Sequence, residues 1–280
     1  MKTTRFVDVE WLSTHLADPS TVVIELTDDP AHDGGPGTIP GARTVYWKSL
    51  LWHRDRRELA STDTLADRLH ALGAHSSSTV VFAGDPPQFA AYALWVSAAQ
   101  GVGGTLKYLD GGVGAWRVAE PATTGGSTPG NTAGARLPIV APRYREVVVG
   151  REDVLAAIDS GTPIVDLRSP EEYAGHRVSP VGEPIDHGAQ RHGRIPGARS
   201  LHIRTLLDED ERVLPVPELR ERIENLDLAD AGELIFYCRL SHRASLGWLV
   251  FEDLLGDSRV RVYDGSWTEW GSIVGAPVER

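Results

Sequence analysis

The only cysteine of this 280-residue chain, Cys238, follows an apolar run, Leu234–Tyr237, that has the character of a buried strand. A helical pattern begins shortly after it and covers residues 244–255. A thiol between a strand and a helix N-terminus faces backbone N–H groups and the positive end of a helix dipole. Both lower the pKa of a thiol and bind anions. The pattern therefore predicts a nucleophilic cysteine in an anion-binding loop.

Cationic side chains follow the thiol. Arg239 and Arg243 are permanently charged, and their guanidinium groups suit multi-oxygen anions. The loop residues expected to bind substrate are Arg239, Leu240, Ser241, His242 and Arg243. This loop is one residue shorter than the loop of cysteine-based phosphatases, which surrounds a tetrahedral phosphate. The shorter loop favours the binding of a sulfane sulfur over that of a phosphate. Phosphatase or arsenate reductase activity is therefore a lower-ranked alternative.

Composition restricts the partners of such a site. The formal net charge of −11 argues against non-specific nucleic-acid binding, so any anion site must be built locally. No apolar run reaches about 18 residues, and the N-terminus lacks the apolar core of a signal peptide, so no membrane partner is expected. A lone cysteine forms neither an internal disulfide nor a metal cluster, which makes a reducing cytoplasm the expected location.

An internal repeat runs through the chain. The sequence Ile-Pro-Gly-Ala-Arg occurs at residues 39–43 and again at 195–199. An Asp-Gly turn that leads to a tryptophan occurs at 109–116 and again, in the same order, at 263–270. The repeated halves are each far longer than about 50 residues, which indicates duplicated domains.

These copies predict two domains, at residues 1–122 and 144–280. Residues 123–143 are rich in Gly, Thr, Pro and Ala and are expected to form a linker on the surface. Within each half, short apolar runs alternate with helical patterns. This alternation predicts α/β domains, each with a mainly parallel sheet flanked by helices.

The two halves differ in their chemistry. A shift of 154 residues (238 minus 84) places Gly84 opposite Cys238, so the first domain has no nucleophile. Asp85 supplies a negative charge where the second domain has Arg239. We therefore expect the first domain to be catalytically inactive, and a cysteine introduced at Gly84 not to create a second site.

The second half also carries an insertion. Glu25 and Ile39 are 14 positions apart, whereas Asp166 and Ile195 are 29 positions apart. The extra residues include a basic group: Arg177, His187, Arg191, His192 and Arg194. Arg177 and Arg191 are candidate substrate-binding residues. Without a cysteine or a pair of acids to complete a ligand set, His187 and His192 are not expected to form a metal site.

Together these motifs resemble those of tandem-domain rhodaneses, which are sulfurtransferases with an inactive N-terminal domain and a catalytic C-terminal one. The similarity is greatest to bacterial thiosulfate sulfurtransferases. The matching segments are 165–168, 171–173, 193–198, 237–239 with Arg243, and 262–267. The resemblance implies that Cys238 accepts sulfur, that the amides of residues 239–243 surround the persulfide, and that Asp264 is structural. Asp166 and Arg168 are expected to form an ion pair beneath the site, and Trp267 to wall the pocket with Trp270.

The function that follows is sulfur transfer in two steps. A Cys238 thiolate takes the outer sulfur of thiosulfate, and an acceptor such as cyanide or a thiol, thioredoxin included, then removes it. Such chemistry needs no metal or organic cofactor. Two arginines and a histidine in the loop favour dianionic thiosulfate, with 3-mercaptopyruvate as the alternative donor.

Ser241 supports a third alternative. Many family loops carry Gly at this position, and a serine adopts the same backbone angles at a cost. Its hydroxyl is also a candidate donor to a bound anion. A loop that is less active for this reason would suit a persulfide carrier with little turnover.

Overall fold

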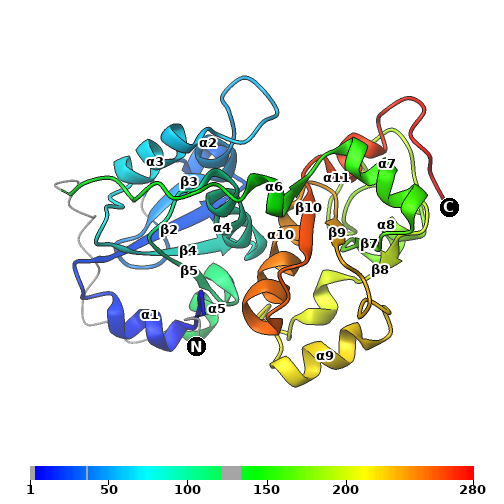
Figure 1. Ribbon diagram of the computed structural model, residues 1–280. Helices are drawn as coiled ribbons and strands as arrows, with labels where there is room; N and C mark the ends of the chain where they lie inside the picture. Colours follow the sequence, from blue (N-terminus) through cyan, green and yellow to red (C-terminus); the bar gives the residue numbers. More distant parts are fainter. Residues whose placement is uncertain (1–3, 36, 121–133) are drawn as a thin grey trace. The chain divides into compact units, whose positions relative to one another are not determined.

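The computed structural model describes residues 4–35, 37–120 and 134–280. The chain divides into two compact units: Met1–Tyr144 with Glu209–Arg212, and Arg145–Asp208 with Val213–Arg280 (Figure 1). Residues 123–133 of the expected linker, 123–143, lie outside the described part. Residues 134–143 run along the first unit, where Ile139 bridges to Val102 and Leu137 is buried.

Each unit contains one five-stranded sheet in which every pair of neighbouring strands is parallel. The first sheet has the order β1-β5-β4-β2-β3 and the second the order β6-β10-β9-β7-β8. Because each strand of the first sheet has its counterpart five numbers later, the two topologies are identical. The expected fold class, two α/β domains with mainly parallel sheets, is confirmed.

The strands are short and buried on both faces, as parallel strands covered by helices must be. The first sheet consists of β1 Phe6–Val7, β2 Thr21–Thr27, β3 Arg43–Tyr46, β4 Thr79–Asp85 and β5 Thr105–Leu109. The second consists of β6 Val148–Val149, β7 Ile164–Asp166, β8 Arg199–Ser200, β9 Leu234–Tyr237 and β10 Val260–Tyr263.

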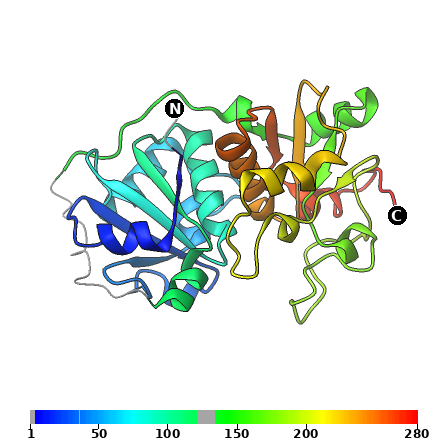
Figure 2. The same cartoon turned by 90° about the horizontal axis from the view of Figure 1, so that it is seen from below.

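Helices cover both faces of each sheet (Figures 1 and 2). The first unit contains α1 Val9–His15, η1 Pro30–His32, α2 Trp47–Leu51, α3 Thr62–Ala71, α4 Gln88–Gln100 and α5 Gly112–Ala119. The second contains α6 Tyr144–Val147, α7 Arg151–Ser160, α8 Pro170–Tyr173, η2 Ile203–Leu206, α9 Val216–Glu224, α10 His242–Leu249, η3 Val250–Leu255 and α11 Ser266–Trp270. Residues of α1 and α5 pack into one core cluster, and residues of α7 and α11 into another.

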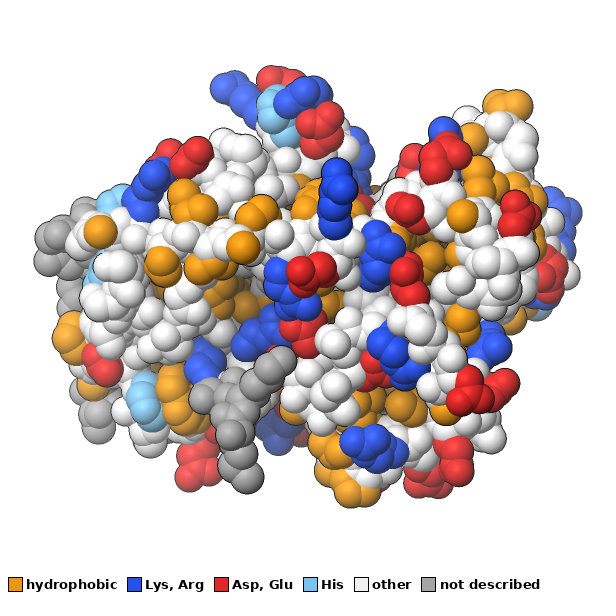
Figure 3. Space-filling model, in the orientation of Figure 1, with side chains coloured by type: hydrophobic (Ala, Val, Ile, Leu, Met, Phe, Trp, Pro, Cys, Tyr) orange, Lys and Arg blue, Asp and Glu red, His pale blue; other side chains and the backbone are white. Residues whose placement is uncertain are grey.

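No helix in the described part of the chain has both the length and the apolar character needed to span a bilayer. On the face drawn in Figure 3, acidic and basic side chains are interspersed. A surface of this kind, in a chain with a net charge of −11, does not attract anions as a whole. Anion binding must come from a local arrangement of cations.

The strand order indicates where in the second unit such an arrangement of cations lies. β7 and β9 are neighbours, but the chain leaves them in opposite directions, toward β8 and β10. Ligands of open parallel sheets bind at such a switch point, outside the carboxyl ends of the strands. Asp166 ends β7, and Cys238 directly follows β9.

Candidate active site

Cys238 begins the loop between β9 and α10, and its side chain is buried, with 1% of the residue exposed. Hydrogen bonds from the N-terminus of α11 fix its backbone. The Cys238 amide donates to Ser266 Oγ at 3.2 Å, and its carbonyl accepts from the Trp267 amide at 2.9 Å. The Arg239 carbonyl accepts from the Thr268 amide at 3.1 Å. The thiol is thereby held at the switch point, before the first turn of α10, whose N–H groups have no partner within the helix.

Ser241 is the residue before α10 and adopts a left-handed φ of 71°. This is the backbone conformation that a glycine would adopt without strain. The Ser241 hydroxyl donates to the main-chain oxygen of Asp264 at 2.6 Å and lies 3.1 Å from its carboxylate. The hydroxyl is therefore directed at Asp264 and not at a bound anion, and this corrects the expectation that it donates to substrate.

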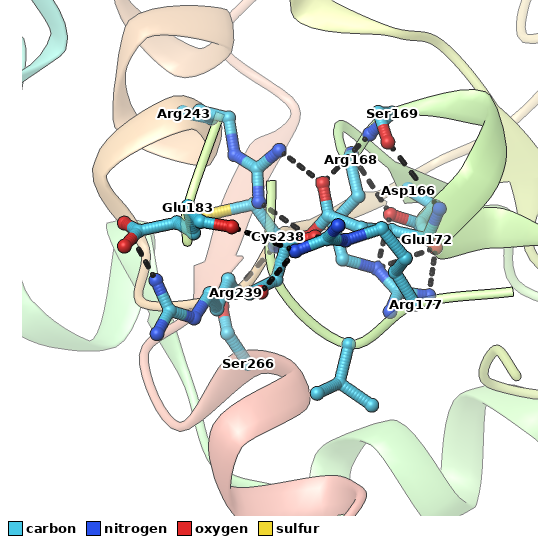
Figure 4. Close-up of polar contacts among 12 residues, drawn as sticks. Asp166, Arg168, Ser169, Glu172, Arg177, Glu183, Cys238, Arg239, Arg243 and Ser266 are labelled. Carbon is cyan, nitrogen blue, oxygen red and sulfur yellow. Dashed lines mark hydrogen bonds and ion pairs between the residues drawn. The ribbon is translucent and has the colours of Figure 1, made fainter. Parts of the chain in front are cut away.

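Arg243 closes the loop through an ion pair that the sequence did not reveal. Its two terminal nitrogens donate to the two carboxylate oxygens of Glu172, at 2.7 and 2.9 Å (Figure 4). Glu172 is fully buried in α8, where it also caps the helix by accepting from the Ser169 amide. Burial opposes the charge of Arg243, but the hydrogen bonds and the charge of Glu172 outweigh it and raise the pKa of Arg243. The guanidinium is therefore a permanent positive charge beside the thiol.

A second buried ion pair is formed by Asp166 and Arg168, as expected. Arg168 Nε donates to Asp166 Oδ1 at 2.9 Å, and both side chains are fully buried. The Tyr237 hydroxyl donates to the same carboxylate, and the Arg168 guanidinium lies 4.4 Å from the centre of the Trp267 ring. Burial next to Asp166 raises the pKa of Tyr237 well above its usual value. This cluster joins β7, β9 and α11.

Arg239 points away from this cluster and into the insertion. Its Nη1 lies 3.5 Å from the Glu183 carboxylate (Figure 4). Its Nη2 lies 3.3 Å from the His187 ring. The main chain at Gly188 packs against the guanidinium, because a Cβ atom there would lie 2.8 Å from Arg239 Nε. Arg239 is thus held by the inserted segment.

The other two candidate arginines, Arg177 and Arg191, have structural contacts. Arg177 donates to the main-chain oxygens of Ser179 and Glu183 within its own loop. Arg191 donates to four main-chain oxygens near the C-terminus, those of Trp270, Gly271, Ile273 and Ala276. These contacts do not support the expectation that either residue binds substrate, because their guanidinium donors are engaged by the protein.

The remaining expected residues lie close to the loop. Leu240 and His242 are partly exposed, and His242 is the first residue of α10. Asp264 accepts from Ser241, as described above. Trp267 and Trp270 are fully buried in the core cluster of α7 and α11, so they are core residues and not the exposed walls of a pocket.

Comparison with known proteins decides the family. The rhodanese-like domain model matches residues 8–119 and 151–273. The chain belongs to the rhodanese family. Among its relatives, a protein from Haloferax volcanii named "Putative thiosulfate sulfurtransferase" is 34% identical, with 98% of this chain and 96% of that protein covered. The "Sulfur carrier protein TtuD" of Thermus thermophilus is also 34% identical, with the same shares covered.

Solved structures show the same rhodanese fold. The ergothioneine complex of the EanB Y353A variant superimposes with a TM-score of 0.80 at 23% identity, covering 98% of this chain and 70% of that one. The structure of YnjE gives a TM-score of 0.77 at 22% identity, covering 99% and 69%. Both likenesses concern the fold.

The first rhodanese-like domain differs from the second at the equivalent position. Gly84 lies near the end of β4, where a Cβ atom would come within 2.5 Å of the Pro86 carbonyl oxygen. The neighbouring Asp85 forms an ion pair with Arg117 at 2.8 Å. A cavity of about 380 Å³ remains at this edge of the sheet, and its acidic lining residues are Glu25, Asp29 and Asp85. The backbone around Gly84 leaves no room for a side chain.

Sequence reasoning missed three site residues: Glu172, Glu183 and Ser266. The spacing Ser169-x-x-Glu172 is that of a capping box, which indicates the start of α8 but not the partnership with Arg243. Glu183 is one of two acids, with Asp186, among the basic residues of the insertion. Ser266 is contained in the repeated turn motif, but its bond to Cys238 spans 28 residues.

Proposed function

We propose that this rhodanese is a thiosulfate sulfurtransferase that works through a persulfide on Cys238. The observation that carries the proposal is the setting of the thiol: it is buried at the switch point between β7 and β9, in a loop bounded by Arg239 and Arg243. Residues 144–280 form the catalytic domain in this proposal, and residues 1–122 the inactive one.

The first step loads the enzyme. The Cys238 thiolate attacks the outer sulfur of thiosulfate, and the sulfur–sulfur bond of the donor breaks. Sulfite leaves with the bonding electron pair and carries two negative charges, and the cysteine retains a persulfide anion. Charge is conserved, because a thiolate and a dianion become a persulfide anion and a dianion.

The second step unloads it. Cyanide or a thiolate attacks the outer persulfide sulfur, and the Cys238 thiolate is released as the leaving group. With cyanide the products are thiocyanate and the original thiolate, so no net oxidation or reduction occurs. One cysteine is sufficient for the cycle, since the acceptor itself removes the sulfur.

Each part of the loop has a proposed role in this cycle. Arg243, fixed by Glu172, supplies a positive charge for the thiolate and the persulfide anion. The N-terminus of α10 follows the thiol, and the positive end of its dipole favours the same anions. Arg239 attracts the donor, and Asp264 holds Ser241 in the left-handed conformation that shapes the loop.

Thiosulfate is preferred to 3-mercaptopyruvate as donor, because two permanent cations border the thiol. The relatives named "Putative thiosulfate sulfurtransferase" support this choice. The relative named as a sulfur carrier supports a second candidate, in which Cys238 carries a persulfide to a protein acceptor with little turnover of small molecules.

The test is steady-state sulfur transfer to cyanide, with thiosulfate and 3-mercaptopyruvate compared for wild type and Cys238→Ser. Cysteine-dependent turnover that prefers thiosulfate is the expected result. A preference for 3-mercaptopyruvate would reassign the donor. Stable gain of one sulfur atom on Cys238, observed by mass spectrometry without turnover, would favour the carrier. The absence of both loading and turnover would refute sulfur transfer at this thiol.

A further inference from the structure

The insertion between α8 and β8 has an internal structure that positions Glu183. The Asp186 carboxylate accepts from the Val178 and Ser179 amides at 2.9 and 3.0 Å. Burial would raise the pKa of Asp186, but these hydrogen bonds outweigh it and lower the pKa, so the carboxylate is charged. Arg177 donates to the Glu183 carbonyl at 2.9 Å. The loop is therefore a built element that presents Glu183 at a defined place.

That place is beside Arg239. The Arg239 side chain is 14% exposed and the Glu183 side chain 40% exposed, so the pair lies at the boundary between the protein and solvent. Within the described residues, Glu183 is the carboxylate that pairs with Arg239. Gly188 has a φ of 112° and no Cβ, which allows the loop to lie close against the guanidinium. The cation that follows Cys238 in the chain is therefore covered by a segment that carries its own anion.

We propose that Glu183 is a specificity-determining residue that opposes anions at Arg239 and so sets the charge of the donor that reaches Cys238. The inference rests on the proposed function only in naming the donor. In this arrangement Glu183 acts through Arg239. It does not touch the reacting sulfur. An anionic donor must replace Glu183 as the partner of the Arg239 guanidinium.

The energy of an approaching ion in the field of Glu183 is proportional to the charge of the ion, so a dianion is opposed twice as strongly as a monoanion. A neutral molecule is not opposed at all. Because the pair is partly exposed and its atoms are 3.5 Å apart, it is weak enough for a bound anion to replace it. Glu183 thus lowers the affinity for every anion and lowers it most for dianions.

The experiment is a charge series on Cys238, the only cysteine of the chain. The reagents are iodoacetamide, which is neutral, iodoacetate, which carries one negative charge, and thiosulfate, which carries two. Alkylation rates are followed by mass spectrometry, and kcat/KM is measured for thiosulfate with cyanide as acceptor. The variants are Glu183→Gln, which keeps the shape but removes the charge, and Glu183→Asp, which keeps the charge. Glu152→Gln, at an exposed position on α7, is the matched control for net charge.

For Glu183→Gln we expect an unchanged rate with iodoacetamide, a rate about three-fold higher with iodoacetate, and a kcat/KM about ten-fold higher with thiosulfate. Glu183→Asp should restore most of the wild-type values, and Glu152→Gln should leave them unchanged. The differences should shrink as the salt concentration rises, because the pair is partly exposed.

Two results would overturn the proposal. One is that the ratio of the iodoacetate rate to the iodoacetamide rate is the same in wild type and Glu183→Gln, or that neither protein is alkylated. The other is equal acceleration with all reagents, which would mean that the substitution merely opens the loop. Absence of thiosulfate turnover in wild type, with the alkylation ratio changed as expected, would refute the proposed function and leave the role of Glu183 intact.

Discussion

Arg243 and Glu172, which are 71 residues apart in the sequence, form a two-bonded ion pair with a fully buried carboxylate. Neither charge can be removed without leaving the other uncompensated in a site from which water is largely excluded. The pair therefore connects the loop of Cys238 to α8 and to the segment that leads into the insertion.

Glu172→Gln tests the cost of breaking this pair. The amide leaves the Arg243 charge buried without a counter-charge, and removing one partner of a buried pair costs about 3 kcal/mol or more. We expect the free energy of unfolding, measured by urea titration at pH 7, to fall by about that amount. Glu152→Gln should change it by less than about 0.5 kcal/mol, because that carboxylate is exposed. Equal stability of the two variants would contradict the account of the pair.

The same carboxylate should contribute to acid unfolding. Burial would raise the pKa of Glu172, but its bonds to Arg243 outweigh burial and lower the pKa below the ordinary value of 4.5. A carboxyl whose pKa is lower in the folded state stabilises the fold above its unfolded pKa, and this contribution is lost as the pH falls through the folded value. Between pH 7 and pH 3, wild type should therefore lose more stability than Glu172→Gln. Parallel pH profiles from urea titrations would contradict this.

Substitutions at Ser241 separate backbone strain from hydrogen bonding. Alanine retains the cost of the left-handed φ and loses the bond to Asp264, so Ser241→Ala should be destabilised by about 1 kcal/mol or more. Glycine also loses the bond but relieves the strain, so Ser241→Gly should be closer to wild type. Urea midpoints measured side by side give the order. A glycine variant less stable than the alanine variant would mean that strain at this position is negligible.

Gly84→Cys in a Cys238→Ser background should have no sulfur transfer activity. A side chain at Gly84 would overlap the Pro86 carbonyl oxygen, and Asp85 places a negative charge beside it. Overpacking of this kind also destabilises, typically by about 1–3 kcal/mol. The assay is thiosulfate:cyanide turnover, together with thermal unfolding to verify that the variant folds. Measurable turnover would show that the first domain still has a usable site.

The sequence was sufficient for the features that depend on neighbours in the chain. Repeated motifs predicted two equivalent domains, alternating patterns predicted parallel sheets, and the run 234–238 placed Cys238 at the end of a buried strand. These inferences succeed because strand, turn and helix signals are local. The ion pair of Asp166 and Arg168 could also be predicted from the sequence, since the two residues are only two positions apart.

Contacts between segments that are distant in the chain could not be predicted from the sequence in this way. An arginine in a basic insertion resembles a substrate ligand, but Arg191 binds carbonyls that are about 80 residues away in the chain. Trp267 follows a loop motif and resembles a pocket wall, yet it packs into the core with α7. Glu183 and Glu172 meet their arginines only after the sheet has brought α8, the insertion and β9 together. Spacing along the chain carries no signal for such partners.

The hydrogen bonds that join Ser266, Trp267 and Thr268 to the backbone of Cys238 and Arg239 have a consequence for synthesis on the ribosome. The thiol precedes the residues that hold it, and β10, which pairs with β9, also follows it in the chain. A nascent chain that has exposed Cys238 but still has residues 260–276 inside the exit tunnel lacks the turn that orients the loop. The Cys238 thiol therefore reaches its final setting late, after the first domain has already been translated.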